Sequence, residues 1–371
     1  MPQNYIEEAA EFIKTCNEKT ALVYDTDADG VTAGAVVSKT MYKLARKYPV
    51  AIPDNHFMPY ITEATRGIYG RLIDDDIESI ITVDMPSDQD SDCVSKLAHS
   101  KRILVIDHHQ PTRDMNSIDN VIHVNSHFLK TDEKPFNYCG SKLSYDICNE
   151  ILITVESSWL AGAGIIGDYS GNAWKDFIDE IYRRYPSIKE GKDIYGNESE
   201  LGEITSLINA GQSFSGSEGA KIAFEACLKS PSPQCILQEM TAPARKLREF
   251  RKSVDKEIDR LIGTWKKNAQ IRDDKKTIFY EPSTTMFVQP EVANRISREK
   301  PDYTFVLTKR AREKTYATLR NIARKVNCGQ LAKFATRNLE NASGGGHDVA
   351  AGANFMTKDK ERFKEEILKY Q

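Results

Sequence analysis

The stretch that decides the fold is Ala21-Leu22-Val23-Tyr24-Asp25-Thr26-Asp27-Ala28-Asp29-Gly30, an apolar run that ends in three alternating aspartates. Two further apolar runs end in the same way, since Ile80–Val83 precedes Asp84 and Ile103–Ile106 precedes Asp107. The segment 121–124 is a weaker fourth run, and residues 32–47 between the first two runs have the composition of a helix. Short, nearly continuous apolar runs are typical of strands buried on both faces. The pattern therefore predicts a doubly wound, mostly parallel α/β sheet.

The rest of the chain predicts a helical region and a second, smaller α/β domain. Residues 142–152 and 172–229 read as mostly helix, with a polar surface loop at 189–197. A long amphipathic helix is expected over residues 244–265, because its apolar residues recur at steps of three and four. Beyond it we expect strands at 277–280, 304–307 and 316–319 and helices at 291–298, 330–338 and 358–369. These elements predict three parts: a metal-binding catalytic domain at 1–235, a helical connector at 236–275 and a substrate-binding domain at 276–371.

Composition narrows the class of protein. The chain has 371 residues, of which 40% are hydrophobic and 28% charged, which is typical of globular protein. It holds no run of 18 apolar residues, so we expect no membrane contact, and its start lacks the pattern of a secretory leader. Its seven cysteines are scattered and form no CxxC pair, which argues against a disulfide framework or a thiolate zinc site. A cytoplasmic location fits these features best.

The net charge of −3 conceals an uneven distribution of charge along the chain. Lys and Arg counted against Asp and Glu give about −14 for residues 1–235, about +4 for 236–275 and about +7 for 276–371. An acidic first part could bind cations, and a basic last part could hold a polyanion. Uneven surface charge without a function is the alternative.

Acidic side chains follow the predicted strands at the point where each strand ends. In an open parallel sheet these positions line a single crevice, and a fourth apolar stretch, Gly164–Gly167, ends in an aspartate as well. The acids expected there are Asp25, Asp27, Asp29, Asp84, Asp107 and Asp168. Six carboxylates cannot crowd one crevice without counter-charge. Two divalent ions supply it, and carboxylates with the imidazoles of His108 and His109 suit Mn²⁺ or Mg²⁺.

A calcium loop is the main alternative for the first aspartate cluster. The EF-hand pattern requires a glutamate six residues beyond its glycine, and that position holds Val36. Asp84 alone could be a helix cap, and each histidine alone could be an ordinary buried or surface residue. Their joint placement at successive strand ends favours the metal site.

A second motif lies downstream, at Ser343-Gly344-Gly345-Gly346-His347-Asp348-Val349-Ala350-Ala351-Gly352. Consecutive glycines let the backbone approach a ligand and present N–H groups to an anion. The histidine at the end of the glycines could then bind phosphate. A flexible turn is the alternative.

These motifs together resemble those of the DHH phosphoesterase superfamily. The match to its four ordered motifs is carried by Asp25-x-Asp27-x-Asp29-Gly30, Asp84, Asp107-His108-His109 and Gly167-Asp168. The segment from Gly344 to Gly352 is similar to the hallmark of the DHH-associated C-terminal domain. The resemblance covers nearly the whole chain and implies hydrolysis of phosphodiester or phosphoanhydride bonds with two divalent cations, Mn²⁺ in preference or Mg²⁺.

The resemblance also implies roles for the matched residues. Six side chains would be metal ligands: Asp25 and Asp27 on one ion, Asp29, His108 and Asp168 on the other, and Asp84 bridging both. The catalytic residues would be Asp107, His108 and His109, with Asp107 orienting a histidine and His109 contacting the scissile phosphate or assisting the leaving group. The substrate-binding residues would be Arg320, Gly344, Gly345, Gly346 and His347.

Within the superfamily, the chain resembles RecJ exonucleases more than the oligonucleotide-degrading NrnA type. Asp25 stands where other branches usually have histidine, and Asn209-Ala210-Gly211 is similar to a RecJ segment. Two features depart from RecJ: Gln212 replaces the arginine after that segment, and the chain has no room for the extra oligonucleotide-binding domain of bacterial RecJ. Both branches therefore stay open.

The function expected is a two-metal phosphodiesterase, in first place a RecJ-like exonuclease acting on single-stranded DNA or RNA from an end. A phosphatase or phosphodiesterase for short oligonucleotides, cyclic dinucleotides, phosphoadenosine phosphate or polyphosphate is the alternative. An inactive replication scaffold is a third possibility, and replication or repair proteins are possible partners. Tyr169, Tyr316 and Phe334 could stack on bases, although a place in the core is the commoner role for such residues.

Overall fold

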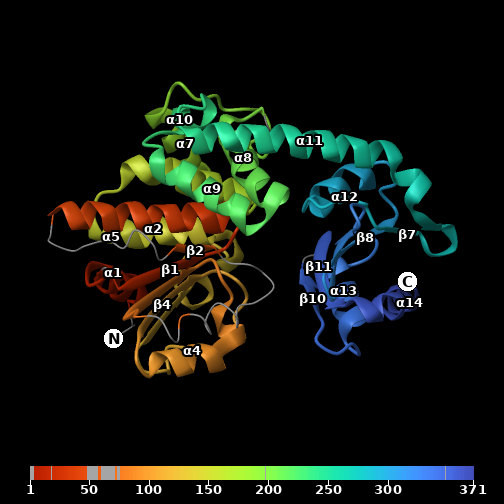
Figure 1. The fold of residues 1–371 in the computed structure, drawn as a ribbon, viewed down its shortest axis with the longest axis horizontal. Coiled ribbons are helices and arrows are strands. Elements are labelled where there is room, and N and C mark those ends of the chain that lie inside the picture. Colours follow the sequence, from red (N-terminus) through yellow and green to blue (C-terminus); the bar gives the residue numbers. More distant parts are fainter. Residues whose placement is uncertain are drawn as a thin grey trace. The chain divides into compact units, whose positions relative to one another are not determined.

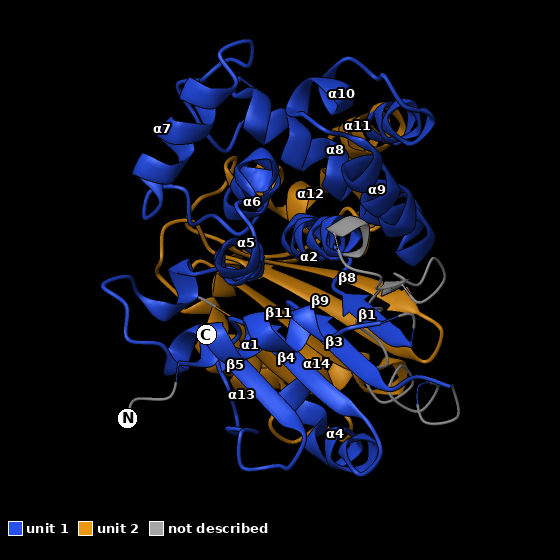
Figure 2. Cartoon of the chain, turned by 90° about the vertical axis from the view of Figure 1, so that its left-hand side faces the viewer, with its two compact units in different colours: residues 1–251 blue, residues 252–371 orange. Residues whose placement is uncertain are grey.

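The computed structural model describes residues 4–17, 19–47, 57–59, 72, 76–196, 198–346 and 348–371. The chain forms two compact units, Met1–Arg251 and Lys252–Gln371 (Figure 2). The boundary between the units falls within the long helix α11 (Ala242–Asn268). The division into a catalytic domain, a connector and a substrate-binding domain remains a prediction.

The first unit is built on a five-stranded parallel sheet, which confirms the predicted fold class. Its strand order is β2-β1-β3-β4-β5. The strands are β1 (Thr20–Tyr24), β2 (Phe57–Pro59), β3 (Ser79–Val83), β4 (Arg102–Asp107) and β5 (Val121–Asn125). Tyr24 pairs with Val83, and Val83 pairs with Ile106, so β1, β3 and β4 reach the same edge of the sheet in register. From β1 the chain adds β2 on one side and β3, β4 and β5 on the other, so the strand order reverses at β1. Ligands of doubly wound sheets bind at such a reversal.

Helices cover both faces of this sheet. Figure 1 shows α2 and α5 on one side of the strands and α4 on the other. Leu22 and Tyr24 enter a large apolar cluster with the first group of helices, whereas Ala21 and Val23 enter a smaller cluster with α4. The apolar runs are therefore buried on both faces, as predicted. The helices of the unit are α1 (Tyr5–Lys14), α2 (Ala28–Lys47), α4 (Ser91–Ala98), α5 (Gly140–Ile151), α6 (Ser158–Gly167), α7 (Lys175–Arg184), α8 (Glu200–Ser215), α9 (Ser217–Lys229) and α10 (Pro233–Leu237).

Two elements differ from the sequence-based expectation. The apolar stretch before Asp168, which we grouped with the strand ends, is the helix α6, because a short run that is apolar on every side carries no period that separates helix from strand. Its glycines allow close packing: a Cβ on Gly164 would lie 2.1 Å from the hydroxyl of Ser141. Helix α2 begins at Ala28 instead of residue 32, because Asp27 caps it by accepting a hydrogen bond of 3.0 Å from the N–H of Gly30.

The second unit is a mixed six-stranded sheet with the order β10-β11-β9-β8-β7-β6. The strands are β6 (Gln270–Arg272), β7 (Thr277–Tyr280), β8 (Thr304–Ala311), β9 (Lys314–Arg320), β10 (Ser343–Gly346) and β11 (Ala350–Met356). The helices are α12 (Gln289–Ser297), α13 (Cys328–Thr336) and α14 (Lys360–Tyr370). Helices α13 and α14 pack their apolar residues against one face of the sheet. Within the glycine motif, Ser343–Gly346 form the edge strand β10, which pairs with β11, so these glycines lie in a strand and not in a flexible turn.

Within the described ranges, no helix combines the length and the apolarity needed to cross a lipid bilayer.

Candidate metal centre

The predicted acidic residues meet at the carboxyl edge of the parallel sheet. Asp25 follows β1, Asp84 follows β3, and Asp107 is the last residue of β4. Because these strands end in register, the three aspartates stand side by side at the β1–β3–β4 edge. In this architecture ligands usually bind at the carboxyl ends of the strands, at the point where the order of the strands along the sheet reverses.

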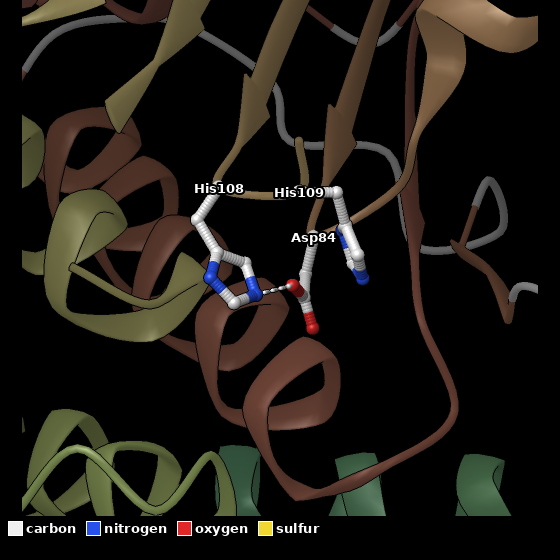
Figure 3. A group of neighbouring side chains, drawn as sticks. All are labelled: Asp84, His108 and His109. Carbon is white, nitrogen blue, oxygen red and sulfur yellow. Dashed lines mark ion pairs between the residues drawn. The ribbon is translucent and has the colours of Figure 1, made fainter. Parts of the chain in front are cut away.

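Five of the predicted ligands lie together around this edge. Oxygens of Asp25, Asp27 and Asp84 lie within 4.8 Å of one another, and so do ligand atoms of Asp84, His108 and His109. Nε2 of His108 is 3.2 Å from Oδ1 of Asp84 (Figure 3). The other ring nitrogen of His108, Nδ1, is 3.8 Å from Oδ2 of Asp168, which caps the C-terminus of α6. Asp84 thus stands between an all-carboxylate group and a histidine-containing group.

Asp29 is engaged differently from the other acids. Its two carboxylate oxygens accept hydrogen bonds from the N–H groups of Gly140, at 2.7 Å, and Ser141, at 2.9 Å. These are the first residues of α5, so Asp29 joins the first turn of α2 to the start of α5. Its Oδ2 also lies 3.9 Å from Nε2 of His108. The structure adds this tethering role, and the ligand role of Asp29 remains a prediction.

Two glycines are required by the close packing of the acidic residues. A Cβ on Gly30 would lie 2.5 Å from the carbonyl oxygen of Asp25, and a Cβ on Gly140 would lie 2.8 Å from Cβ of Asp84. Any side chain at either position would displace an acid of the site. Asp84 itself has a φ of +58°, a left-handed conformation that aspartate tolerates better than most residues. Its N–H is held by the carbonyl of Ile106 at 2.8 Å.

Burial and mutual repulsion raise the carboxylate pKa values. Burial first, and then the neighbouring charge of Asp27, raises the pKa of Asp25 to about 8. The pKa of Asp84 is raised well above its ordinary value by burial and by Asp29 and Asp27. Burial also raises the pKa of Asp168 to about 7, where the charge of nearby His108 only partly opposes it. The acidic group therefore requires protons or cations to be stable when folded.

The histidines are pulled the other way by the same carboxylates. Burial alone would lower the pKa of His108, but Asp168 and Asp29 outweigh it and raise that pKa. Burial likewise opposes the charged form of His109, yet Asp107 raises its pKa to about 10. Nδ1 of His109 lies 2.8 Å from Oδ1 of Asp107. Burial would raise the pKa of Asp107, but the charge and hydrogen bonds of His109 lower it overall. His109 is therefore a cation at neutral pH, and its side chain is 42% exposed.

The donor set fits hard divalent cations. Carboxylate oxygens with one or two imidazoles are the ligands of Mn²⁺ and Mg²⁺, whereas the described residues place no thiolate in these groups. Oδ1 of Asp84 and Nδ1 of His108 are buried and have ion-pair contacts but no hydrogen bond, which is unfavourable unless a cation or a proton satisfies them. Asp84 lies in both groups, so its predicted role as the bridge between two ions is compatible with its position.

Four further residues support the loops of the site by hydrogen bonds, and only two of them, Asn209 and Gln212, stand out in the sequence, as residues of a motif. The side-chain amide of Asn125, at the end of β5, donates to the carbonyl of His109 at 3.0 Å. Asp88 is buried and accepts from the N–H of Thr112, at 2.5 Å, in the loop that follows the histidines. Asn125 could have been found, because it ends the fourth predicted strand at the same edge. No sequence signal marked Asp88.

Helix α8 supports the aspartate loop from the other side. The amide oxygen of Asn209 accepts a hydrogen bond from the N–H of Ala28 at 2.8 Å. One helical turn later, the side-chain amide of Gln212 donates to the hydroxyl of Thr26 at 2.6 Å. Both residues therefore fix the loop between Asp25 and Ala28.

Four of the predicted substrate-binding residues lie in strands of the second unit's sheet: Arg320 in β9 and Gly344, Gly345 and Gly346 in β10. Arg320 is the last residue of β9 and pairs with Ala350 of β11, whose next residue pairs with Gly346 of β10. Gly344 passes so close to α13 that a Cβ would lie 2.5 Å from the carbonyl of Ala332, and Gly346 has a φ of +138°. His347 lies outside the described residues.

Family models match both units. The DHH family N-terminal domain matches residues 19–165, and the DHHA1 domain matches residues 274–371. No curated protein sequence matches the chain with significance.

Solved structures share the fold at low sequence identity. RecJ from Thermus thermophilus in complex with Mn²⁺ is 19% identical with a TM-score of 0.74 over 100% of this chain, which spans 55% of the RecJ chain. Exonuclease RecJ bound to manganese is 19% identical with a TM-score of 0.68, covering 100% of this chain and 95% of that one. CDC45 from Entamoeba histolytica is 10% identical with a TM-score of 0.53, over 99% and 97% of the two chains.

The order of the acidic motifs along the sheet edge, the mixed sheet that carries the glycine motif and the two domain matches agree with one another. Proteins of this family are hydrolases of phosphoester bonds. The chain belongs to the DHH family, with a DHH domain followed by a DHHA1 domain and a fold similar to that of RecJ.

Proposed function

We propose that this protein is a phosphodiesterase that uses two divalent cations, Mn²⁺ in preference or Mg²⁺, and removes nucleotides from an end of single-stranded DNA or RNA. The observation that carries the proposal is the placement of Asp84 between the carboxylates of Asp25 and Asp27 and the imidazole of His108. These carboxylates repel one another when no cation is bound, so the group would destabilise an edge that had only a structural role.

In this proposal each side chain of the edge has a distinct task. Asp25 and Asp27 would hold one ion, Asp29, His108 and Asp168 would hold the other, and Asp84 would contribute to both. When bound, a pair of divalent ions makes water a better nucleophile and neutralises charge on the phosphoryl group and its leaving oxygen. The buried position of Asp84 and Asp29 excludes bulk water from the ligands and strengthens their hold on cations.

His109 acts on the substrate and not on the ions. Asp107 keeps its imidazole charged and oriented, so a cationic N–H group is available at neutral pH. A positive group at this place attracts the scissile phosphate and stabilises negative charge that develops during bond cleavage. Asp107 is therefore a positioning residue.

The second unit is proposed to hold the substrate strand through its phosphates. Arg320 and the edge strand Gly344–Gly346 supply a guanidinium and backbone N–H groups at one end of the sheet, and His347 follows directly. Contacts of this kind read the backbone and not the base sequence. A cytoplasmic location and replication or repair proteins as partners stay predictions.

The test is hydrolysis of end-labelled strands of graded length, from dinucleotides upward, as DNA and as RNA, with Mn²⁺ and Mg²⁺ compared. Asp84→Asn should lower kcat by about 100-fold or more, because one substitution weakens both ions. Asp76→Asn is the matched control, since its side chain is 88% exposed and lies outside the site. Preference for the shortest strands alone would replace the exonuclease with a small-substrate enzyme. A protein that binds no Mn²⁺ and cleaves nothing would be a scaffold instead.

A further inference from the structure

Tyr169 stands directly after the predicted metal ligand Asp168 and is the feature of this edge that the proposed function leaves unexplained. Its side chain is not part of the core, because the residue is 71% exposed. The other described tyrosine with a largely exposed side chain, Tyr370, is 36% exposed. A large aromatic ring left in water beside a charged site loses the free energy that burial would provide. A ligand that covers the ring would recover that free energy.

The backbone at Tyr169 breaks a local rule. The N–H of Ser170 bonds to the carbonyl of Ile165 at 3.0 Å, and the N–H of Tyr169 bonds to that of Ile166 at 3.2 Å. These two bonds form a Schellman motif at the end of α6, in which the left-handed position is normally glycine. Tyrosine occupies it here with a φ of +57°. Strained positions of this kind cluster at functional sites.

A second tyrosine holds the exposed ring in place. The rings of Tyr169 and Tyr195 are stacked, with centroids 5.3 Å apart and planes inclined by 29°. The hydroxyl of Tyr195 donates to the carbonyl oxygen of Tyr169 at 3.1 Å and accepts from the N–H of Asn172 at 3.3 Å. One face of the Tyr169 ring is thus supported from behind, and the ring is ordered before any ligand arrives.

Tyr169 is also tied to the metal centre by the chain itself. The hydroxyl of Ser170, whose side chain is buried, donates to Oδ2 of Asp168 at 3.3 Å. That same oxygen lies 3.8 Å from Nδ1 of His108. Tyr169 therefore lies between Asp168 and Ser170, which holds the carboxylate of Asp168 by a hydrogen bond. The position of its ring relative to Asp168 is set by two ordered neighbouring residues.

We infer that Tyr169, supported by Tyr195, is a stacking platform for a nucleobase of the substrate, beside the phosphate that is cleaved. The inference rests on the proposed function and assigns it a specificity residue. A planar base gains stacking energy on an ordered aromatic ring, and every base has such a face. The enzyme should accordingly require a base next to the scissile phosphate without selecting which base it is.

The test compares two labelled hexamers: a thymidine strand and a strand of the same length made of abasic tetrahydrofuran residues. Each is assayed with the Mn²⁺-loaded full chain for cleavage, and for binding by fluorescence anisotropy with EDTA-treated protein. Tyr169→Ala should lower the preference for the thymidine strand, as the ratio of kcat/KM values, by about 10-fold. Tyr169→Trp should retain the preference, and Phe136→Ala, which removes an aromatic residue 52% exposed elsewhere in the unit, is the control.

The outcomes separate the platform from the proposed function. If Tyr169→Ala loses activity equally on both strands, or if the ratio is unchanged, the stacking platform is wrong. Cleavage by the unaltered protein would still support the phosphodiesterase. Tighter anisotropy binding of the thymidine strand that depends on Tyr169, without any cleavage, would support the platform and defeat the phosphodiesterase. Tyr169→Gly should fold at least as well as Tyr169→Ala, because glycine relieves the left-handed backbone, and it should lose the same preference.

Discussion

Asn209 of α8 accepts a hydrogen bond from the N–H of Ala28, which lies 181 positions earlier in the chain. That N–H belongs to the first residue of α2, directly after Asp27 of the metal loop. A helix outside the sheet thus fixes where the loop ends and the helix begins. The contact explains why a segment with three alternating carboxylates keeps one conformation despite their repulsion.

Removing this contact should weaken both folding and metal binding. Asn209→Ala leaves the N–H of Ala28 without its partner, which should cost about 1–3 kcal/mol of unfolding free energy. We expect the affinity for Mn²⁺ to fall by about 10-fold, because the loop then samples other conformations. Calorimetric titration of Mn²⁺ and thermal unfolding measure the two effects. Glu218→Ala, at an exposed position of α9, is the control, and an unchanged Mn²⁺ affinity in Asn209→Ala would contradict the positioning role.

The pKa shifts predict how the metal-free protein responds to pH. Asp25 and Asp168 have pKa values raised by burial to about 8 and about 7, so the folded protein binds more protons than the unfolded chain between about pH 4 and 8. His109, raised to about 10, adds to this difference above pH 6.5, because its cation is held only in the folded protein. Stability must therefore fall as pH rises.

Thermal unfolding in EDTA measures this dependence. We expect the Tm to drop by roughly 5 °C or more from about pH 6 to about pH 9. Added Mn²⁺ should raise the Tm more at the alkaline end of this range, because it then replaces protons that are no longer bound. Asp84→Asn, which removes one charge from the group, should flatten the dependence. A metal-free protein that becomes more stable as pH rises would show that the carboxylates are not crowded.

The pair of Asp107 and His109 can be tested on its own. Asp107→Asn keeps a side chain of the same size but removes the negative charge, so the pKa of His109 should fall from about 10 towards 6.5. NMR titration of the His109 ring measures the pKa directly. Activity of the variant should decline above about pH 7, where the unaltered enzyme still carries the charge. An unchanged pKa of His109 in Asp107→Asn would show that Asp107 does not raise it.

Arg320 should act on substrate binding and not on the chemical step. Arg320→Ala removes a guanidinium that we propose to hold a substrate phosphate, and charge-assisted contacts of this kind are worth a KM increase of about 10-fold or more. We expect kcat to change little. Arg310→Ala, an exposed arginine on the neighbouring strand β8, is the matched control. The same KM in Arg320→Ala and in the unaltered enzyme would exclude Arg320 from the substrate site.

Much of the fold could be predicted from sequence because it depends on local patterns. Apolar runs such as Ile103–Ile106 are short, continuous and end in aspartate, which a buried parallel strand explains well. The order of these runs along the chain predicts that Asp25, Asp84 and Asp107 share one edge of the sheet. The apolar stretch before Asp168 also ends in an aspartate but is a helix, because burial on all sides erases the period by which helix and strand differ.

What the sequence determined by itself is the chemistry: which acids and imidazoles are present, and that successive strand ends gather them. Only the tertiary structure decided how those groups are supported, because hydrogen bonds such as that from Ala28 to Asn209 join positions far apart in the chain. It also decided that Tyr169 faces water with a left-handed backbone while its neighbours are held in place. Exposure and backbone conformation are set by packing, and no local pattern of residues encodes them.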